Sequence, residues 1–472
     1  MDELERLRQE NQELRARVAE LEGMVKNLVE QLKQDSHNSS WPSSRDKGRK
    51  RQTRSLRQKS DRAVGGQKGH KGHTLAKQAK PDVIEIHRPL ECAHCHQEIE
   101  ENATVSGVKK RQVLDLPPLR FITTEHRAEA VVCSGCGEIT EASFPEEVKV
   151  PVQYGPRVKQ LAVYLHNEQF IPYARTQQFL SDLFHLPTSV GSLQNFIAAG
   201  AKRVEPVVEL IKQAVTQIEV GHVDETGFYV GGKRHWLHTV SNGQLSYYAS
   251  HRRRGQVATD EIGILPRFTG VLVHDAWATY FKYSQATPAL CHAHHLRNLI
   301  AIIENDQQKW AQWMCSFLLA AKALVQERHE AGLTQFPQAQ LVNIHRLYDV
   351  IVKQGLAENP LPDKPPPKGK RGRRQKSKAR NLVERFDKRK SMMLLFIHDF
   401  KVPFDNNLAE RDIRMMKVQQ KVSGCFRSES GASQFCQLRS YTATMRKQGL
   451  NVWDALGSLF SDQPQFPQLT PV

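Results

Sequence analysis

The chain has 472 residues and a formal net charge of +17, from 67 Lys and Arg against 50 Asp and Glu. This length exceeds a single ordinary hydrophobic core, so we expect about three or more domains. The sequence has no long apolar run and no N-terminal signal-like region, which predicts a soluble intracellular protein and excludes a membrane partner. In a reducing compartment, its 8 cysteines are expected to be thiols or metal ligands rather than disulfides.

The positive charge is concentrated in two tracts. Residues 45–80 hold 13 Lys and Arg against 2 acids, and residues 364–380 hold 9 with no acid. Such local concentrations favour a polyanionic partner such as nucleic acid, although either tract could be a solvated linker. The second tract contains the candidate DNA-binding residues Lys370, Arg371, Arg373 and Arg374.

The N-terminal residues follow a heptad pattern. Leucine and valine occupy the a and d positions over 1–35, and Asn11 is the one polar interruption, at an a position. This pattern predicts a parallel leucine-zipper coiled coil whose register Asn11 fixes. A single amphipathic helix packed on its own domain is the alternative. We predict a homodimer or higher homo-oligomer formed through this segment.

Residues 36–81 lack any hydrophobic period and are rich in Ser, Gly, Lys and Arg, which predicts a flexible basic linker. Within it, GGQKGHKGH could bring lysines and histidines to phosphates. Composition alone supports only a solvated linker there.

Two CxxC pairs follow, in ECAHC and VVCSGC, separated by 37 residues. Two such pairs in a reducing cell predict one tetrahedral structural zinc ion, whereas a lone pair could be a redox site. The ligands would be Cys92, Cys95, Cys133 and Cys136, with His94 as a bystander. Strand-like runs such as FITTEHRAEAVV predict a small zinc-binding β domain over 82–150.

The pattern becomes helical over 151–213. ARTQQFLSDLFHLPTSVGSLQNFI predicts a helix, a short turn at 186–188 and a second helix capped by Ser189. This spacing fits a helix-turn-helix, so we expect a DNA-binding-like helical domain. Core helices without DNA contact fit the same residues equally well.

Aspartates mark two of the strands that follow. IEVGHVDETGFYVGGKRHWLHTVSNGQLSYYASHRR predicts an antiparallel meander with Gly-Gly and Asn-Gly turns, and GVLVHDAWATY predicts a fourth strand. Asp224 lies in the first strand and Asp275 ends the fourth. An aspartate in an apolar strand is costly unless it binds a cation or donors. Adjacent strands would bring both carboxylates to one sheet edge.

The stretch FDNNLAERDIRMMKVQQK predicts an amphipathic helix in which Glu410 lies among cations. Its expected apolar stripe is Leu408, Met415, Val418 and Val422. Glu410 could form a capping box with Asn407 as N-cap, or it could complete a metal site with the two aspartates. The candidate DNA-binding cations are Arg411, Arg414, Lys417 and Lys421.

The chain resembles DDE-class transposases of the insertion-sequence 66 family. The resemblance rests on the zipper start, GGQKGHKGHTL, the two CxxC pairs, HVDETGFYV, VHDAWATY, DNNLAERDIR and FRSESGASQFCQLRSYTATMRKQG, in this order. It implies a multidomain α+β protein with an RNase H-like mixed α/β catalytic core. The core would occupy 214–300 and 395–450, interrupted by a helical insertion at 301–394 with a basic, Pro-rich arm and followed by a tail at 451–472.

The resemblance also implies that Asp224, Asp275 and Glu410 form the acidic triad. Carboxylate oxygens suit magnesium, and two such ions can stabilise the attacking and leaving oxygens of a phosphoryl displacement. Two rival carboxylates are less suitable. Glu225 points to the opposite strand face, and capping explains Asp405.

One position departs from the family pattern. CHAHHLRNL has His292 where relatives usually carry Trp, while Cys291 and His294 match. The departure leaves the packing role of His292 open. Cys291 and His294 have zinc-ligand spacing, but no second pair is evident in the sequence, so we expect a packed structural role.

These features predict a transposase that cleaves insertion-sequence ends and transfers the strand into target DNA with two Mg²⁺ ions. Its partners would be element-end and target DNA, a second copy of the chain and accessory proteins of the same element. We expect a cytoplasmic bacterial protein, associated with the nucleoid when it binds DNA. An inert dimeric DNA-binding regulator, or an RNase H-fold nuclease that cleaves without joining, is the alternative.

Overall fold

The computed structural model describes residues 75–361, 376–461 and 464–469, together with scattered residues between 9 and 39. Most of the expected coiled coil and basic linker therefore lies outside the described residues. So do Lys370, Arg371, Arg373 and Arg374. The described zipper residues Val18, Leu21 and Val25 are helical, and their exposed fractions are 54%, 54% and 58%. The zipper stays a prediction.

A five-stranded mixed sheet forms the centre of the fold. Its strands are β3 (Val220–Val230), β4 (Lys233–Ser241), β5 (Ser246–His251), β6 (Val271–His274) and β7 (Thr287–Leu290). They lie in the order β5-β4-β3-β6-β7. The first three strands form the antiparallel meander predicted from the sequence, whereas β6 and β7 run parallel to β3. Gly231 and Gly232 turn β3 into β4 with φ values of 55° and 77°, which glycine adopts without strain.

The helical segment before the sheet comprises α2 (Pro156–Val163), the π-helical turn η2 (Tyr164–Glu168), α3 (Tyr173–Phe184) and α4 (Val190–Val215). The predicted helix, turn and second helix are confirmed, and the Ser189 hydroxyl caps α4 by accepting from the backbone of Ser192. The buried stripe of α4 continues for most of its length into the main core. Helix α4 therefore packs against the sheet as part of the main hydrophobic core.

The two faces of the sheet pack into different hydrophobic clusters. Along β3, Val223 belongs to the cluster that includes α4, while Phe228 belongs to a cluster with Met415 and Met416. Alternate residues of a strand point to opposite faces, so the parity of these positions explains the division. Asp224 shares the face of Phe228.

The last three helices are α12 (Asn407–Ser423), α13 (Glu429–Lys447) and α14 (Val452–Phe460). On α12, Met415 is buried as expected, but Val418 and Val422 are 41% and 44% exposed. Ala409, Met416 and Gln419 are buried instead. The predicted apolar stripe is therefore wrong for Val418 and Val422, because the helix presents a different face to the sheet from the one expected.

The stretch from residue 451, expected to be a tail, is part of the core. Helix α14 packs against α2 and α4, and Leu456 and Leu459 are buried. The expected tail is therefore corrected to a core helix followed by a short end segment.

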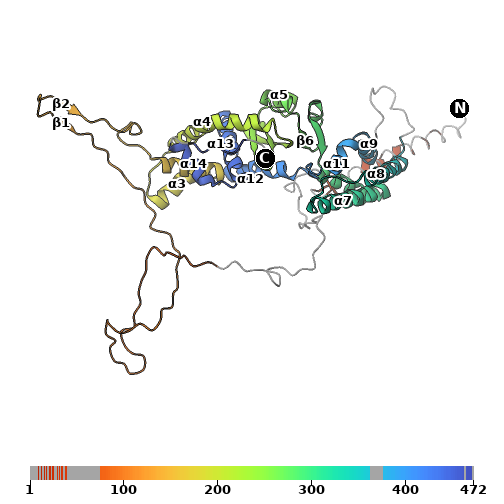
Figure 1. Ribbon diagram of the computed structural model, residues 1–472. Helices are drawn as coiled ribbons and strands as arrows, with labels where there is room; N and C mark the ends of the chain where they lie inside the picture. The colour runs from red at the N-terminus through yellow and green to blue at the C-terminus, as the bar shows by residue number, and fades with distance from the viewer. Residues whose placement is uncertain are drawn as a thin grey trace.

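The expected helical insertion packs on the β7 side of the sheet (Figure 1). It consists of α6 (His292–Asp306), α7 (Lys309–Glu330), α8 (Gln338–Glu358), α9 (Lys378–Lys388), α10 (Lys390–Met393) and α11 (Leu395–His398). Its helices extend past the predicted bounds of 301–394 at both ends. Val273 and Leu290 of the sheet share its hydrophobic cluster, so the insertion and the sheet form one continuous core.

The structure explains His292, the position that departs from the family pattern. Its ring stacks on Phe404 with 4.6 Å between centroids and meets Phe396 edge-on at 5.0 Å. Its Nε2 atom bonds the carbonyl of Met393 at 2.8 Å. His292 therefore fills an aromatic niche between α6 and the segment that leads into α12.

A buried ion cluster ties η2 to α13. Glu168, with a side chain that is 0% exposed, accepts from Arg439 and Arg446 at 2.6 Å each and from the Thr442 hydroxyl at 2.6 Å. Burial raises the pKa of the Glu168 carboxyl, but the two guanidinium groups and the hydroxyl outweigh it, so the pKa lies below its ordinary value. The carboxylate is thus charged and fully paired, as a buried charge must be.

The cysteine-rich segment contains one short hairpin, β1 (Ala130–Val132) and β2 (Ile139–Glu141). The longer strand expected over 121–132 is therefore reduced to its last three residues. Across the described part of the chain, no helix has the length and apolar character needed to cross a membrane.

Candidate active site

The strand register brings the two predicted aspartates together. Strands β3 and β6 pair in parallel, with Val220 opposite Val271 and His222 opposite Val273. Continued by two residues, this register aligns Asp224 with Asp275 at the point where β6 ends. Directly opposed residues of neighbouring parallel strands point to the same face of the sheet, so the continued register places Asp224, midway along β3, next to Asp275, just past the end of β6.

The surroundings of Asp224 disfavour the charged form of its carboxyl group. Burial, followed by the negative charges of Glu225, Asp275 and Glu410, raises the pKa of Asp224 well above its ordinary value. The backbone N–H of Glu225, which donates to Asp224 at 2.8 Å, lowers the pKa and so acts in the opposite direction. Such a group is stabilised as a carboxylate when a cation joins it.

The backbone turns sharply after Asp275. Ala276 has φ of 72°, in the left-handed region that residues with a side chain rarely adopt. The carboxylate of Asp275 accepts from the backbone N–H of Trp277 at 2.9 Å, which closes the turn. Strained backbone of this kind is frequent where a functional side chain must be aimed.

Asn406 holds the start of α12 against β3. Its side chain accepts from Nδ1 of His222 at 2.8 Å and donates to the carbonyl of Val223 at 2.8 Å. Its backbone N–H points to Sγ of Cys291 at 3.2 Å. Sequence reasoning missed this residue and chose its neighbour Asn407 as the cap. The only available signal was a polar pair at the helix start, which does not reveal which member faces inward.

Glu410 does not form a capping box. The N-cap position is Asn406, whose N–H donates to Cys291, and in the described part of the chain the buried Oε1 of Glu410 has no hydrogen-bond partner. That oxygen lies 3.6 Å from Nδ1 of His294. Burial and then Arg297 lower the pKa of His294, opposed by the charges of Glu410 and Asp275, and the net direction is downward. Glu410 therefore faces the aspartates and α6.

The rival carboxylates are engaged elsewhere. Glu225 accepts two bonds from Arg254, at 2.8 and 2.6 Å, and one from the Tyr280 hydroxyl, and its pKa is raised to about 7 chiefly by burial. The Arg254 guanidinium lies over the rings of Trp236 and Trp277. Asp405 accepts from the N–H of Asn407 at 3.1 Å, which agrees with the capping role expected for it.

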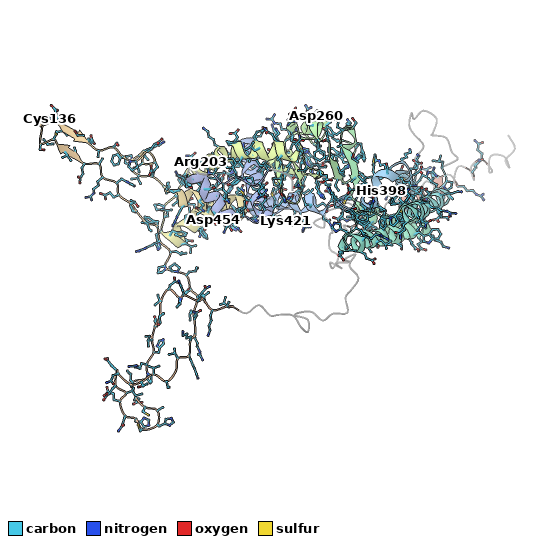
Figure 2. All side chains as sticks on the ribbon, in the orientation of Figure 1. Cys136, Arg203, Asp260, His398, Lys421 and Asp454 are labelled. Carbon is cyan, nitrogen blue, oxygen red and sulfur yellow. The ribbon has the colours of Figure 1, made fainter. Side chains whose placement is uncertain are left out.

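The predicted DNA-binding cations of α12 behave differently from one another. Arg411, Arg414 and Lys421 are exposed, and Figure 2 labels Lys421 on the surface of the helix. Lys417 is exposed too, but its ammonium donates to the carbonyl of Gly227 in β3, and partial burial of that group lowers its pKa. Lys417 is therefore in part a structural contact.

The insertion contributes a cation that sequence reasoning missed. Arg385 of α9 is buried enough that its pKa is lowered, and the charge of Asp275 opposes that shift. At the end of the basic tract, Lys376 and Arg380 both bind Glu384, at 2.6 and 2.8 Å. Those two residues are thus paired within the protein.

The two CxxC segments have the same backbone geometry. In the first, Cys92 N–H donates to Gln97, and Cys92 carbonyl accepts from His96; in the second, Cys133 makes the same bonds to Glu138 and Gly137. His96 and Gly137 both have left-handed φ, 60° and 76°. Among the described residues the four sulfurs are not gathered, and Cys136 lies at the far end of the hairpin (Figure 2).

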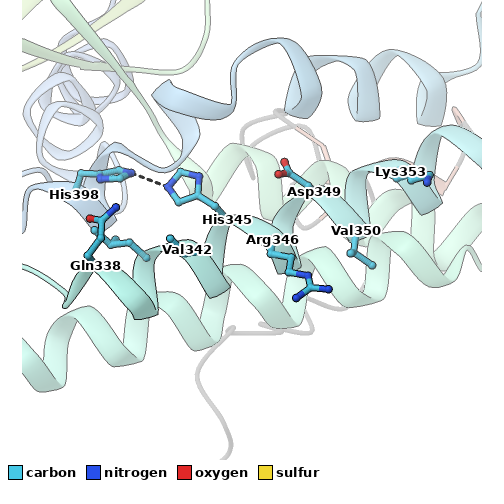
Figure 3. A pocket seen from close by; sticks show the side chains of 9 residues that line it. Gln338, Val342, His345, Arg346, Asp349, Val350, Lys353 and His398 are labelled. Carbon is cyan, nitrogen blue, oxygen red and sulfur yellow. Dashed lines mark hydrogen bonds between the residues drawn. The ribbon is translucent and has the colours of Figure 1, made fainter.

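A pocket of about 700 Å³ lies on the insertion, between α8 and His398, and contains none of the candidate site residues. In it, Nε2 of His345 and Nε2 of His398 are 2.9 Å apart (Figure 3). Burial lowers the pKa of His345, so a neutral ring can donate this bond to its neighbour.

Comparisons with known proteins give two family matches. Residues 151–434, more than half of the chain, match the model described as Transposase IS66 family. Residues 1–76 match the model of a family of unknown function. No curated protein matches the chain.

Proposed function

The chain belongs to the transposase IS66 family, and is thus a DNA-acting enzyme; we propose that it cleaves DNA at insertion-sequence ends and joins the freed strand to target DNA. The observation that carries the proposal is the β3–β6 register, which aligns Asp224, midway along β3, with Asp275, just past the end of β6. Glu410 lies near them, and its charge contributes to the raised pKa of Asp224.

The residues present fit divalent cations. Asp224 is a half-buried carboxyl among like charges, and one oxygen of Glu410 has no hydrogen-bond partner among the described residues. Asp224, Asp275 and Glu410 would hold two Mg²⁺ ions. When bound, these ions supply the positive charge that stabilises the attacking and leaving oxygens of an in-line displacement at phosphorus.

The protein's part in the reaction is to hold and orient. The three carboxylates come from β3, the end of β6 and the first turn of α12, so a rigid sheet and a packed helix fix their separation. Arg414 and Lys421, exposed on α12, would bind phosphates of the DNA, and Arg385 would add positive charge from the insertion.

The reaction consists of two transfers at phosphorus. Water attacks a phosphodiester at the element end, the bond to the 3′ oxygen breaks, one proton of the water ends on that 3′ oxygen, and the other leaves to solvent. The new 3′-hydroxyl then attacks a target phosphodiester and displaces a target 3′-hydroxyl. Each step exchanges one phosphorus–oxygen bond for another, so no oxidant or external energy source is needed.

The remaining segments are proposed to assemble the DNA complex. The predicted zipper would pair two chains, each bound to one element end, and the four knuckle cysteines would hold one structural Zn²⁺. The basic arm, with Lys370, Arg371, Arg373 and Arg374, would bind phosphates without reading sequence. Accessory proteins of the element are further proposed partners.

The test is an assay with purified protein, Mg²⁺, a DNA carrying the inverted repeats that flank the gene and a circular target. Transposition predicts a nick at the repeat end and a product in which the 3′ end is covalently joined to the target. Cleavage without joined product would favour the nuclease alternative. Repeat binding without either product would favour the inert regulator.

A further inference from the structure

A second metal-ligand group lies beside the aspartates. Sγ of Cys291, Nδ1 of His294 and a carboxylate oxygen of Glu410 all lie within 4.8 Å of one another. Among the described residues, no other three side chains of His, Cys, Asp and Glu are grouped in this way. The sequence showed the Cys-x-x-His spacing but not its partner, because Glu410 lies more than a hundred residues away.

The distances between the three side chains are compatible with a bound ion. Nδ1 of His294 is 3.4 Å from Sγ of Cys291 and 3.6 Å from Oε1 of Glu410. The second distance is too long for a hydrogen bond. Ligand bonds of about 2.0 to 2.3 Å at tetrahedral angles separate neighbouring donor atoms by roughly 3.3 to 3.6 Å. Both distances are measured from Nδ1 of His294, and both are close to the separation expected between two donor atoms bound to the same ion.

The surroundings fit a site that is fixed on one side and open on the other. Cys291 is 0% exposed and is held by the N–H of Asn406, whereas the side chains of His294 and Glu410 are 21% and 28% exposed. Three protein ligands and one accessible side leave room for a fourth ligand from solvent or substrate.

We propose that Cys291, His294 and Glu410 bind a thiophilic divalent cation, Zn²⁺ in the cell, which fastens the first turn of α6 to the first turn of α12. A thiolate and an imidazole select zinc over magnesium. On binding, the Cys291 thiol proton is released to solvent and the sulfur forms the metal bond. A carboxylate has two oxygens, so Glu410 can serve this ion and the neighbouring aspartates. The inference goes beyond the proposed function and does not depend on it.

The first experiment counts zinc in the full-length protein after dialysis against buffer with Mg²⁺ and no free zinc. Wild type should hold about two zinc ions per chain, one in the cysteine knuckles and one here. Cys291→Ser and His294→Gln should each lose about one. Cys436→Ser changes another buried cysteine and should lose none. Thermal unfolding of each variant shows whether it is folded. Because the His294 side chain is 21% exposed, His294→Gln should fold even if Cys291→Ser does not.

The second experiment removes the competing site. In full-length protein with Cys92, Cys95, Cys133 and Cys136 changed to serine, Co²⁺ should produce a thiolate-to-metal charge-transfer band, and adding Cys291→Ser should abolish it. The proposal is overturned if no band forms with excess Co²⁺. It is equally overturned if the zinc content survives both Cys291→Ser and His294→Gln. Neither readout uses DNA, so failure of transposition leaves these outcomes unchanged.

Discussion

His222 and Asn406, 184 residues apart in the chain, form a buried hydrogen bond of 2.8 Å between Nδ1 and the side-chain oxygen. The same amide donates to the carbonyl of Val223. Burial lowers the pKa of His222, so the ring is neutral and donates from Nδ1. This pair fixes the start of α12 on β3, one turn before Glu410.

We predict that Asn406→Ala slows cleavage while DNA affinity stays unchanged. The variant leaves a buried donor and a buried carbonyl without partners, at a cost of about 2 kcal/mol, and frees the helix start that positions Glu410. Urea unfolding and single-turnover cleavage measure the two effects. Asn407→Ala, at the exposed neighbour, is the matched control. Equal behaviour of the two variants would mean that the bond positions nothing.

The triad variants Asp224→Asn, Asp275→Asn and Glu410→Gln should each abolish cleavage and joining. Each keeps the shape of the side chain but removes a charge that holds the cations, and double variants should do no further harm because the groups act as a unit. Gel assays of nicking and joining measure the loss, and DNA binding should persist. Asp405→Asn, which can still cap α12, should remain active. Near-normal cleavage by Glu410→Gln would remove Glu410 from the metal site.

Glu168→Gln should destabilise the fold by about 3 kcal/mol, because it leaves the Arg439 charge buried without its anion. The pKa of Glu168 is lowered in the folded state. Its stabilising contribution is therefore fully present above the ordinary value of 4.5 and is lost as the pH falls through the folded pKa. Urea midpoints from neutral to acidic pH should converge for wild type and variant. Glu429→Gln, which breaks an exposed pair with Arg252, should change little. If the urea midpoints of wild type and Glu168→Gln differed by the same amount at every pH, the lowered pKa of Glu168 would not explain the loss of stability.

Cys133→Ser should release one zinc ion and speed the exchange of backbone amide hydrogens in residues 82–150. The rest of the described chain should keep its protection against hydrogen exchange. The physical reason is that a structural zinc replaces the hydrophobic core that so small a segment lacks. Hydrogen exchange with mass spectrometry, together with metal analysis, measures both effects. Full zinc retention in this variant would rule out a shared knuckle site.

A peptide covering the predicted zipper should sediment as a dimer at micromolar concentration. Asn11→Leu should raise its melting temperature but allow other oligomers, because a buried asparagine trades stability for a defined register. Analytical ultracentrifugation of both peptides is the measurement. If the wild-type peptide sedimented as a monomer, the segment would be better interpreted as a single amphipathic helix than as a zipper.

Much of the local structure could be predicted because it depends on local sequence. The meander with its glycine turn at Gly231 and Gly232, the Ser189 cap and the helix that carries Glu410 all follow from residue type and period. The orientation of polar side chains at the ends of these elements was harder to predict. Asn407 was one candidate cap for α12, but the N-cap position is Asn406, because residue type does not reveal which of two neighbouring asparagines turns inward.

The sequence indicated most of the strands and helices, with Asp224 inside β3, Asp275 just after β6 and Glu410 in the first turn of α12, although it did not indicate β7 and α14 was expected to be a tail. It also carried the family motifs. The tertiary structure alone decided the β3–β6 register that aligns the two aspartates, the inward turn of Asn406 and the meeting of Glu410 with Cys291 and His294. Periodicity follows from local backbone geometry, whereas register and distant side-chain contacts depend on how complete elements pack against one another.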